Sequence, residues 1–376
     1  MSKRQKIERV SGVVSPHTKH NKLESELDNT SCALSGSGSE LPSPDEFIKS
    51  FNITTDIKNT ITTARRTIND IINGRDKRLL LIIGPCSIHN INDGYIYAQA
   101  LNEIREAYKD KFYIVMRTYF EKPRTTTGWK GLISDPNLNE TYDINKGIEI
   151  SRIFLIRVLA LGLPIACELL ETITPLYLQD LFCYGCIGAR TTESQIHRQM
   201  ASGVSCAMGF KNNTSGEIDN AINSMTFSKL PQTFIGLSKM GKISIIKTKG
   251  NKNCHIILRG GKSGTNYDME SVKNVIEKLN KKNENNKILI DCSHDNSNKS
   301  YKEQINVINK IANNFKNDIN AKKYIFGLMI ESYLNSGNQK LDINNIANLK
   351  SGLSITDECI SLNETMNILE NLYNQY

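Results

Sequence analysis

The chain has 376 residues, of which 39% are hydrophobic and 23% are charged, so it is long enough to bury a large core. It contains no run near the roughly 18 apolar residues that a membrane helix needs, which argues against a membrane-spanning protein. The formal net charge of +8 is spread over segments such as KKNENNK (residues 281–287) without interleaved aromatic residues, which argues against nucleic-acid binding. A cationic cleft for small anionic substrates explains the charge equally well.

Residues 1–45 are polar, and the stretch SGSGSELPSP (residues 35–44) has the composition of a flexible segment. We therefore predict a flexible N-terminal arm over residues 1–50, a candidate for regulation, and one catalytic barrel domain over residues 51–376. The start of the chain lacks the apolar segment of a secretory signal. Nine cysteines are scattered, several of them inside apolar runs, which indicates a reducing compartment and favours a cytoplasmic protein.

Short apolar runs alternate with longer amphipathic stretches from about residue 55 onward, a pattern typical of a mostly parallel α/β fold. The predicted strands are residues 78–84, 112–118, 163–169, 185–190, 204–210, 254–260, 287–293 and 324–330. Helical patterns between them include residues 95–108, 148–161, 175–182 and 301–315. Eight strands with intervening helices predict a (β/α)8 TIM barrel, and the alternating segment 234–250 adds an extra β-hairpin between the fifth and sixth strands.

Charged side chains follow the predicted strands, and in a barrel the carboxyl ends of the strands form the mouth that holds the active site. Six cations would meet there: Arg117, Lys122, Arg124, Arg190, Lys211 and Arg259. Each of them alone is consistent with an ordinary surface charge. Together they would repel one another unless an anion lies between them, and arginine and lysine suit phosphate and carboxylate oxygens. The set predicts a phosphorylated carboxylic acid as the ligand.

A second set at the same ends offers ligands for a divalent metal: Cys86, His294, Glu331 and Asp357. One thiolate, one imidazole and two carboxylates suit a borderline ion such as Mn²⁺, Fe²⁺, Co²⁺ or Zn²⁺. These residues are far apart in the sequence and form no metal motif. Taken singly, the cysteine is equally consistent with a small buried apolar side chain, the histidine with a loop residue, and each carboxylate with a cap or a surface charge.

Eight short blocks closely resemble the type I 3-deoxy-D-arabino-heptulosonate 7-phosphate (DAHP) synthases, in the order found in that family. They are GPCSIH (84–89), EKPRTTTGWKGL (121–132), GARTTESQ (188–195), GFKN (209–212), ILRGGK (257–262), CSHDNSNK (292–299), MIES (329–332) and SITDEC (354–359). The resemblance extends from about residue 55 to residue 362. The segments 234–250 and KSGTNYD (262–268) are similar to the fungal and enterobacterial branch.

The resemblance implies a metal-dependent condensation of phosphoenolpyruvate with D-erythrose 4-phosphate and water, which yields DAHP and phosphate at the start of the shikimate pathway. It also implies residue roles. The metal ligands would be Cys86, His294, Glu331 and Asp357, and the phosphoenolpyruvate contacts Arg117, Lys122, Arg190, Lys211 and Arg259. Arg124 and Thr125 would contact erythrose 4-phosphate. The expected catalytic residues are Lys122, Cys86 and His294, with the metal as Lewis acid and Lys122 or a metal-bound water moving protons.

Regulation is where the sequence departs from the family. The resemblance implies an aromatic amino-acid inhibitor and a homodimer or homotetramer, but residues 1–50 match the family's arm poorly. Pro175 and Ser205 lie where the resemblance places the effector pocket, while Leu176 replaces a common glutamine. A serine at position 205 would occupy the space that a tyrosine hydroxyl needs, so we expect phenylalanine to be the inhibitor rather than tyrosine.

Three functions are compatible with the sequence. The first is the active synthase. The second is a related synthase that joins phosphoenolpyruvate to a longer sugar phosphate, and the KPRTT block (residues 122–126) argues against it. The third is a non-catalytic regulatory paralogue that binds aromatic amino acids, and the four intact ligand candidates argue against that.

Overall fold

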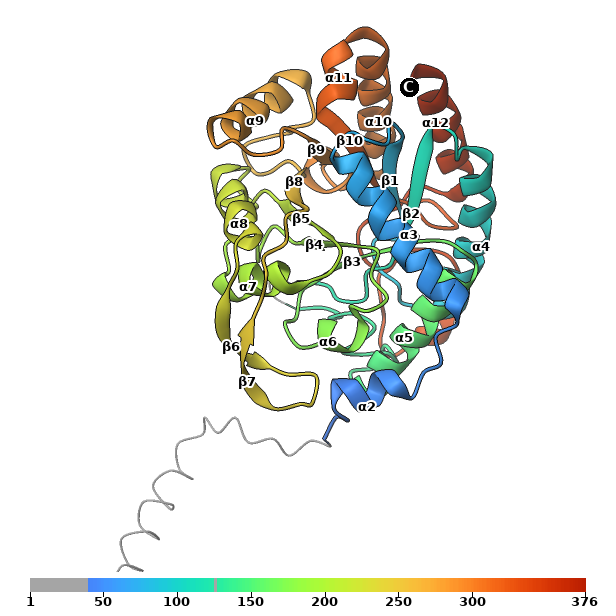
Figure 1. Cartoon of the computed structure of the whole chain (residues 1–376). Coiled ribbons are helices and arrows are strands. Elements are labelled where there is room, and N and C mark those ends of the chain that lie inside the picture. Colours follow the sequence, from blue (N-terminus) through green and yellow to red (C-terminus); the bar gives the residue numbers. More distant parts are fainter. Residues whose placement is uncertain (1–39, 125–126) are drawn as a thin grey trace, which may run out of the picture. The chain divides into compact units, whose positions relative to one another are not determined.

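A computed structural model describes residues 40–124 and 127–376. The residues from Pro42 to Tyr376 form one compact unit around a closed barrel of parallel strands (Figure 1). The barrel strands are β1 (Leu79–Gly84), β2 (Phe112–Arg117), β3 (Ile165–Glu168), β4 (Tyr184–Ile187), β5 (Ala207–Lys211), β8 (Cys254–Leu258), β9 (Ile288–Asp291) and β10 (Ile325–Glu331). They pair in the order β1-β10-β9-β8-β5-β4-β3-β2, and β2 closes onto β1. The predicted TIM barrel is confirmed.

The barrel strands are continuous apolar runs because both of their faces are covered. In β1 all six residues, LLLIIG, are buried, and β8 and β10 are buried along their whole length. Parallel strands packed between a barrel interior and outer helices need apolar side chains on both sides, which replaces the alternation seen in half-exposed strands. The register pairs Gly84 of β1 with Glu331 of β10, so the carboxyl ends of these two strands lie side by side.

The helices surround the barrel (Figure 1), and the longer ones bury an apolar face. They are α2 (Pro44–Lys49), α3 (Thr55–Ile72), α4 (Ile91–Ala107), α5 (Ile144–Ala160), α6 (Pro175–Leu178), α7 (Gln195–Gly203), α8 (Asp219–Lys229), α9 (Met269–Lys281), α10 (Tyr301–Asn317), α11 (Ile319–Tyr324) and α12 (Leu362–Gln375). In α9 the buried residues are Val272, Val275, Ile276 and Leu279, the spacing of one helical face, and the Asp268 side chain caps its first turn.

The predicted hairpin is confirmed as β6 (Thr233–Leu237) and β7 (Ile243–Lys247), an antiparallel pair that follows α8 and precedes β8. Several predicted ranges were too long, among them those of the fourth strand and of the helix after the third strand. The fourth strand ends at Ile187, because the chain turns at once with a hydrogen bond from Thr191 N to Gly188 O. The helix predicted over 175–182 ends at Leu178.

The helix α2 falls inside the range assigned to the N-terminal arm, and the boundary at residue 50 stays a prediction. Within the described part of the chain, no helix is both long and apolar enough to cross a membrane.

Candidate active site

Three of the predicted metal ligands come together at the carboxyl ends of β1 and β10. The Cys86 Sγ, one Glu331 carboxylate oxygen and one Asp357 carboxylate oxygen all lie within 4.8 Å of one another. Cys86 follows β1, and Glu331 is the last residue of β10. The loop that carries Asp357 returns to the same edge, because Ile360 N donates to Glu331 O at 3.0 Å. Three residues from distant parts of the sequence thus form one cluster.

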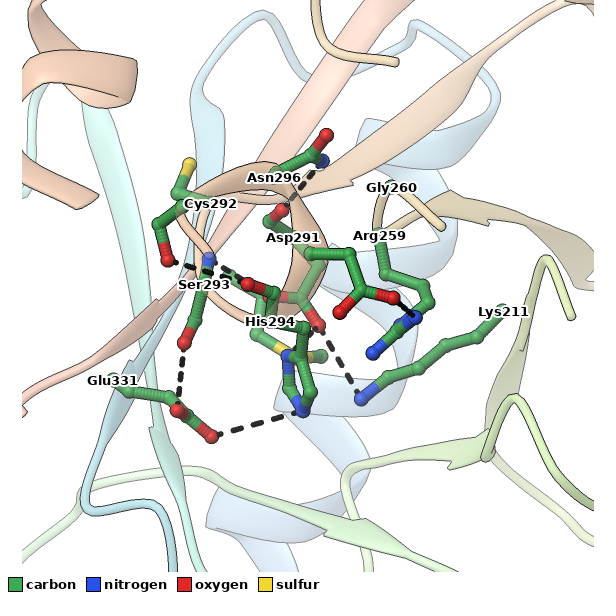
Figure 2. A network of polar contacts seen from close by, with 12 residues as sticks. Lys211, Arg259, Gly260, Asp291, Cys292, Ser293, His294, Asn296 and Glu331 are labelled. Carbon is green, nitrogen blue, oxygen red and sulfur yellow. Dashed lines mark hydrogen bonds and ion pairs between the residues drawn. The ribbon is translucent and has the colours of Figure 1, made fainter. Parts of the chain in front are cut away.

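His294, the fourth predicted ligand, lies just outside this close set. Its Nε2 is 3.9 Å from Glu331 Oε1, and its Nδ1 is 2.9 Å from Asp291 Oδ2 (Figure 2). The residue has a left-handed backbone, φ 55°, at the start of the 3-10 turn His294–Asn296 that follows β9. Non-glycine residues rarely adopt this conformation. The thiol, the imidazole and the two carboxylates are the donor types that a borderline divalent ion takes, so these residues fit the predicted cation.

Two cations compensate the acidic groups of the cluster. Arg117 Nη2 donates to Glu331 Oε1 at 2.7 Å, with both side chains fully buried, and Lys122 Nζ lies 3.1 Å from Cys86 Sγ. Burial alone would raise the pKa of Glu331, but Arg117 and His294 lower it below its ordinary value. Burial and the charge of Glu331 raise the pKa of Cys86, so the thiol keeps its proton until a cation displaces it.

A cavity of about 440 Å³ opens beside the cluster, and most of the predicted cations line it. Its lining residues with ionisable side chains are Lys122, Arg124, Glu168, Arg190, Lys211, Arg259, Lys262, His294, Asp295, Lys299 and Asp357. Arg117 is buried against Glu331 and is not among the lining residues. Arg259 forms an ion pair with Asp295, but its buried Nε has no hydrogen-bond partner among the described residues. A buried donor in this position needs an acceptor, and an anionic ligand would supply one.

Two acids of this site were missed by the sequence analysis. Lys211 Nζ lies 3.1 Å from Glu168 Oε2 and 3.3 Å from Asp291 Oδ2, and all three side chains are buried or nearly so. Burial would raise the pKa of Glu168, but Lys211 and Lys122 lower it to about 2. The available signal for Glu168 was its place at the carboxyl end of the third predicted strand. Asp291 lies inside the predicted strand 287–293 and gave no signal of its own.

The predicted erythrose 4-phosphate contacts are only partly described. Arg124 is exposed at the mouth, and its Nε donates to Trp129 O at 2.8 Å. Thr125 lies outside the described residues. The indole of Trp129 is buried and donates to Asp135 O at 2.8 Å, so the tryptophan packs in the loop that carries Arg124.

The predicted effector residues lie on a separate, larger cavity of about 780 Å³. Its walls come from α6, from α7 and the segment that follows it, and from the β6–β7 hairpin. Pro175 and Ser205 both line it, as does Leu176 in place of the common glutamine. Phe234 and Ile246 add apolar side chains to its lining. An apolar cavity with a few polar groups is a typical site for a small ligand.

Comparisons with known proteins agree with the geometry. The sequence matches the DAHP synthetase I family over residues 52–370. It is 48% identical to a putative phospho-2-dehydro-3-deoxyheptonate aldolase of Schizosaccharomyces pombe, covering 83% of this chain and 84% of that protein. It is 46% identical to the Phe-sensitive aldolase of Escherichia coli K12, and the match covers 89% of this chain and 94% of that protein. The solved phospho-2-dehydro-3-deoxyheptonate aldolase of Francisella tularensis SCHU S4 superposes with a TM-score of 0.87 at 42% identity, covering 91% of this chain and 98% of that one.

Proposed function

The chain belongs to the DAHP synthetase I family, and we propose that it condenses phosphoenolpyruvate with D-erythrose 4-phosphate and water to give DAHP and phosphate, the first step of the shikimate pathway. The observation that carries the proposal is the contact between two sites. A cavity rich in lysine and arginine lies directly beside the cluster of Cys86, Glu331 and Asp357. The cavity suits a phosphorylated acid, and the cluster suits a divalent cation.

Phosphoenolpyruvate would lie among the cations of the 440 Å³ cavity. Its phosphate and its carboxylate both accept forked hydrogen bonds, which Arg190 and Arg259 can donate, while Lys211 adds a point charge. Glu168 and Asp291 hold the Lys211 ammonium in place. Arg124 and Thr125 would bind the phosphate of erythrose 4-phosphate and place its aldehyde toward the cluster.

Cys86, His294, Glu331 and Asp357 would hold one divalent cation, which supplies Lewis-acid polarisation of the aldehyde oxygen. The terminal carbon of phosphoenolpyruvate forms a bond to the aldehyde carbon, water adds at the carbon that carries the phosphate, and phosphate leaves. Lys122 would protonate the aldehyde oxygen. Burial would lower its pKa, but Cys86 and Glu331 raise it above the ordinary value, so Lys122 enters the reaction as a charged donor.

The test is phosphate release from phosphoenolpyruvate, with and without erythrose 4-phosphate, after chelation and after Mn²⁺, Co²⁺ or Zn²⁺ is restored. We expect release only with both substrates and a metal. If a five-carbon sugar phosphate supports faster release, the related synthase replaces this proposal. If no metal supports turnover while aromatic amino acids bind, the regulatory paralogue replaces it.

We also propose that phenylalanine binds in the 780 Å³ cavity and inhibits the enzyme. The relatives include Phe-sensitive and Tyr-sensitive enzymes of E. coli and a phenylalanine-inhibited enzyme of Saccharomyces cerevisiae, so the similarity alone does not choose between the two amino acids. Ser205 on the cavity wall favours phenylalanine because its hydroxymethyl group takes up space that a phenol hydroxyl needs. Equal inhibition by both amino acids, or by neither, would contradict this.

A homodimer or homotetramer is the proposed assembly, and the hairpin supports it. Ile235, Ile243 and Ile245 are 79%, 83% and 72% exposed, and exposed apolar side chains grouped in this way mark interaction surfaces. The mass of the protein in solution tests this.

The eight described cysteines are all buried and unpaired, which supports the proposal of a reducing compartment, the cytoplasm.

A further inference from the structure

We propose that Asp291 is a positioning residue that holds His294 in the tautomer and orientation required to bind the cation, and that the same carboxylate fixes Lys211 for phosphoenolpyruvate. The inference rests on the proposed function. It assigns a role to Asp291, which lies outside the eight sequence blocks that resemble the family. One buried carboxylate would then connect the metal half and the substrate half of the site.

The two carboxylate oxygens of Asp291 contact different groups. It is the last residue of β9 and is fully buried. Its Oδ1 accepts from Ser293 N at 3.1 Å. Its Oδ2 lies 2.9 Å from His294 Nδ1 and 3.3 Å from Lys211 Nζ (Figure 2). Neither Oδ2 nor Nδ1 makes a hydrogen bond of good geometry among the described residues, so each is a buried polar atom whose nearest complementary partner is the other, at 2.9 Å.

The surrounding turn points the other imidazole nitrogen at the cluster. Lys299 N donates to His294 O at 2.8 Å, and the Asn296 side chain donates to Asp291 O at 2.9 Å, which anchors the backbone on both sides of the ring. With Nδ1 toward Asp291, Nε2 lies 3.9 Å from Glu331 Oε1. Ser293 of the same turn donates to Glu331 Oε2 at 2.7 Å. The turn therefore places the imidazole and the carboxylate of Glu331 together.

The tautomer follows from the donor and acceptor types. A neutral imidazole carries one N–H, and an ionised carboxylate can only accept. Next to Asp291 the proton therefore belongs on Nδ1, which leaves the lone pair of Nε2 free for a cation. Carboxylates that accept from metal-binding histidines in this way fix the ring and strengthen it as a ligand.

Replacing Asp291 with asparagine should reverse this arrangement. The Ser293 N–H needs an acceptor, so the amide oxygen takes the position of Oδ1 and the amide NH₂ takes that of Oδ2. That NH₂ then donates to His294 Nδ1 and faces the Lys211 ammonium. The imidazole proton moves to Nε2, where it blocks cation binding, and Lys211 keeps only Glu168 as a carboxylate partner.

The experiment uses the full-length, metal-free protein with ¹⁵N-labelled histidine. Long-range ¹H–¹⁵N spectra, followed in pH until the ring is neutral, report the tautomer of His294, whose signal is assigned by its loss in His294→Gln. We expect the Nδ1–H form in the wild type and the Nε2–H form in Asp291→Asn. Competition with a chelator should show a Zn²⁺ affinity lower by roughly 10–100-fold in Asp291→Asn, and steady-state kinetics should show a higher KM for phosphoenolpyruvate.

The matched control is Asp180→Asn, which removes a carboxylate that accepts two hydrogen bonds from the fully buried Arg152 on the outside of the barrel. It should change stability but neither the tautomer nor the Zn²⁺ affinity. An Nε2–H tautomer in the wild type overturns the proposal even if Asp291→Asn does not fold, and so does an unchanged Zn²⁺ affinity in a folded Asp291→Asn. The tautomer is measured without turnover, so a failure of the proposed reaction would be seen separately, as absent phosphate release by the wild type.

Discussion

Replacing Glu168 with glutamine should destabilise the protein measurably, because Glu168 is one of two carboxylates that compensate the buried Lys211. The pKa of Glu168 is lowered from 4.5 to about 2 in the folded chain. A carboxyl whose folded pKa lies below its unfolded pKa contributes stability that is present above the unfolded value. At 1.36 kcal/mol for each pKa unit, the difference corresponds to about 3 kcal/mol at neutral pH. This contribution is lost as pH falls from 4.5 through about 2.

The assay is urea denaturation of wild type and Glu168→Gln, repeated at decreasing pH. We expect a lower free energy of unfolding at pH 7, and a difference that shrinks as the wild-type carboxyl becomes protonated. The control is Glu217→Gln, because Glu217 is exposed, and such changes are usually within about 0.5 kcal/mol. A Glu168→Gln protein as stable as the wild type at pH 7 would refute the reasoning, as would a difference that stays constant down to acid pH.

Three further variants test the rest of the site. Cys86→Ala should fold, but its rate of phosphate release should fall by more than the roughly 10–100-fold that is typical when a residue hydrogen-bonded to a metal ligand is replaced. Near-full metal-dependent turnover would exclude Cys86 as a ligand. Ser205→Gly should make tyrosine a better inhibitor, and an unchanged ratio of tyrosine to phenylalanine inhibition would remove Ser205 from the effector site. Glu121→Gln should be more stable than the wild type at about pH 8 and equal to it at about pH 4. The reason is that burial raises the pKa of Glu121 to about 7, and the hydrogen bond from Thr174 only partly opposes this rise. Thermal unfolding at both pH values checks the prediction, and a variant less stable than the wild type at pH 8 would contradict it.

The sequence was most informative where a residue's chemistry depends on its position along a strand. Apolar runs predicted all eight barrel strands, because a parallel strand covered on both faces is built mainly from apolar side chains. The charged residues of these strands stand at their carboxyl ends. The strand ends then predicted Lys211 and Arg259 at the mouth, since barrel strands all end at one rim. The bounds were less accurate: Arg190 lies beyond β4 because a turn at Gly188, which depends on local backbone hydrogen bonds, ends the strand early.

The sequence by itself determined the barrel, the family and the residue types of the cluster, because apolar periodicity and short ordered blocks are properties of the chain alone. Only the tertiary structure decided which charges meet. Arg117 is buried against Glu331 and does not line the cavity, and Lys211 lies between Glu168 and Asp291. These pairs join residues from different strands, and their electrostatic energies depend on distance and burial. Neither quantity can be read from positions in a sequence.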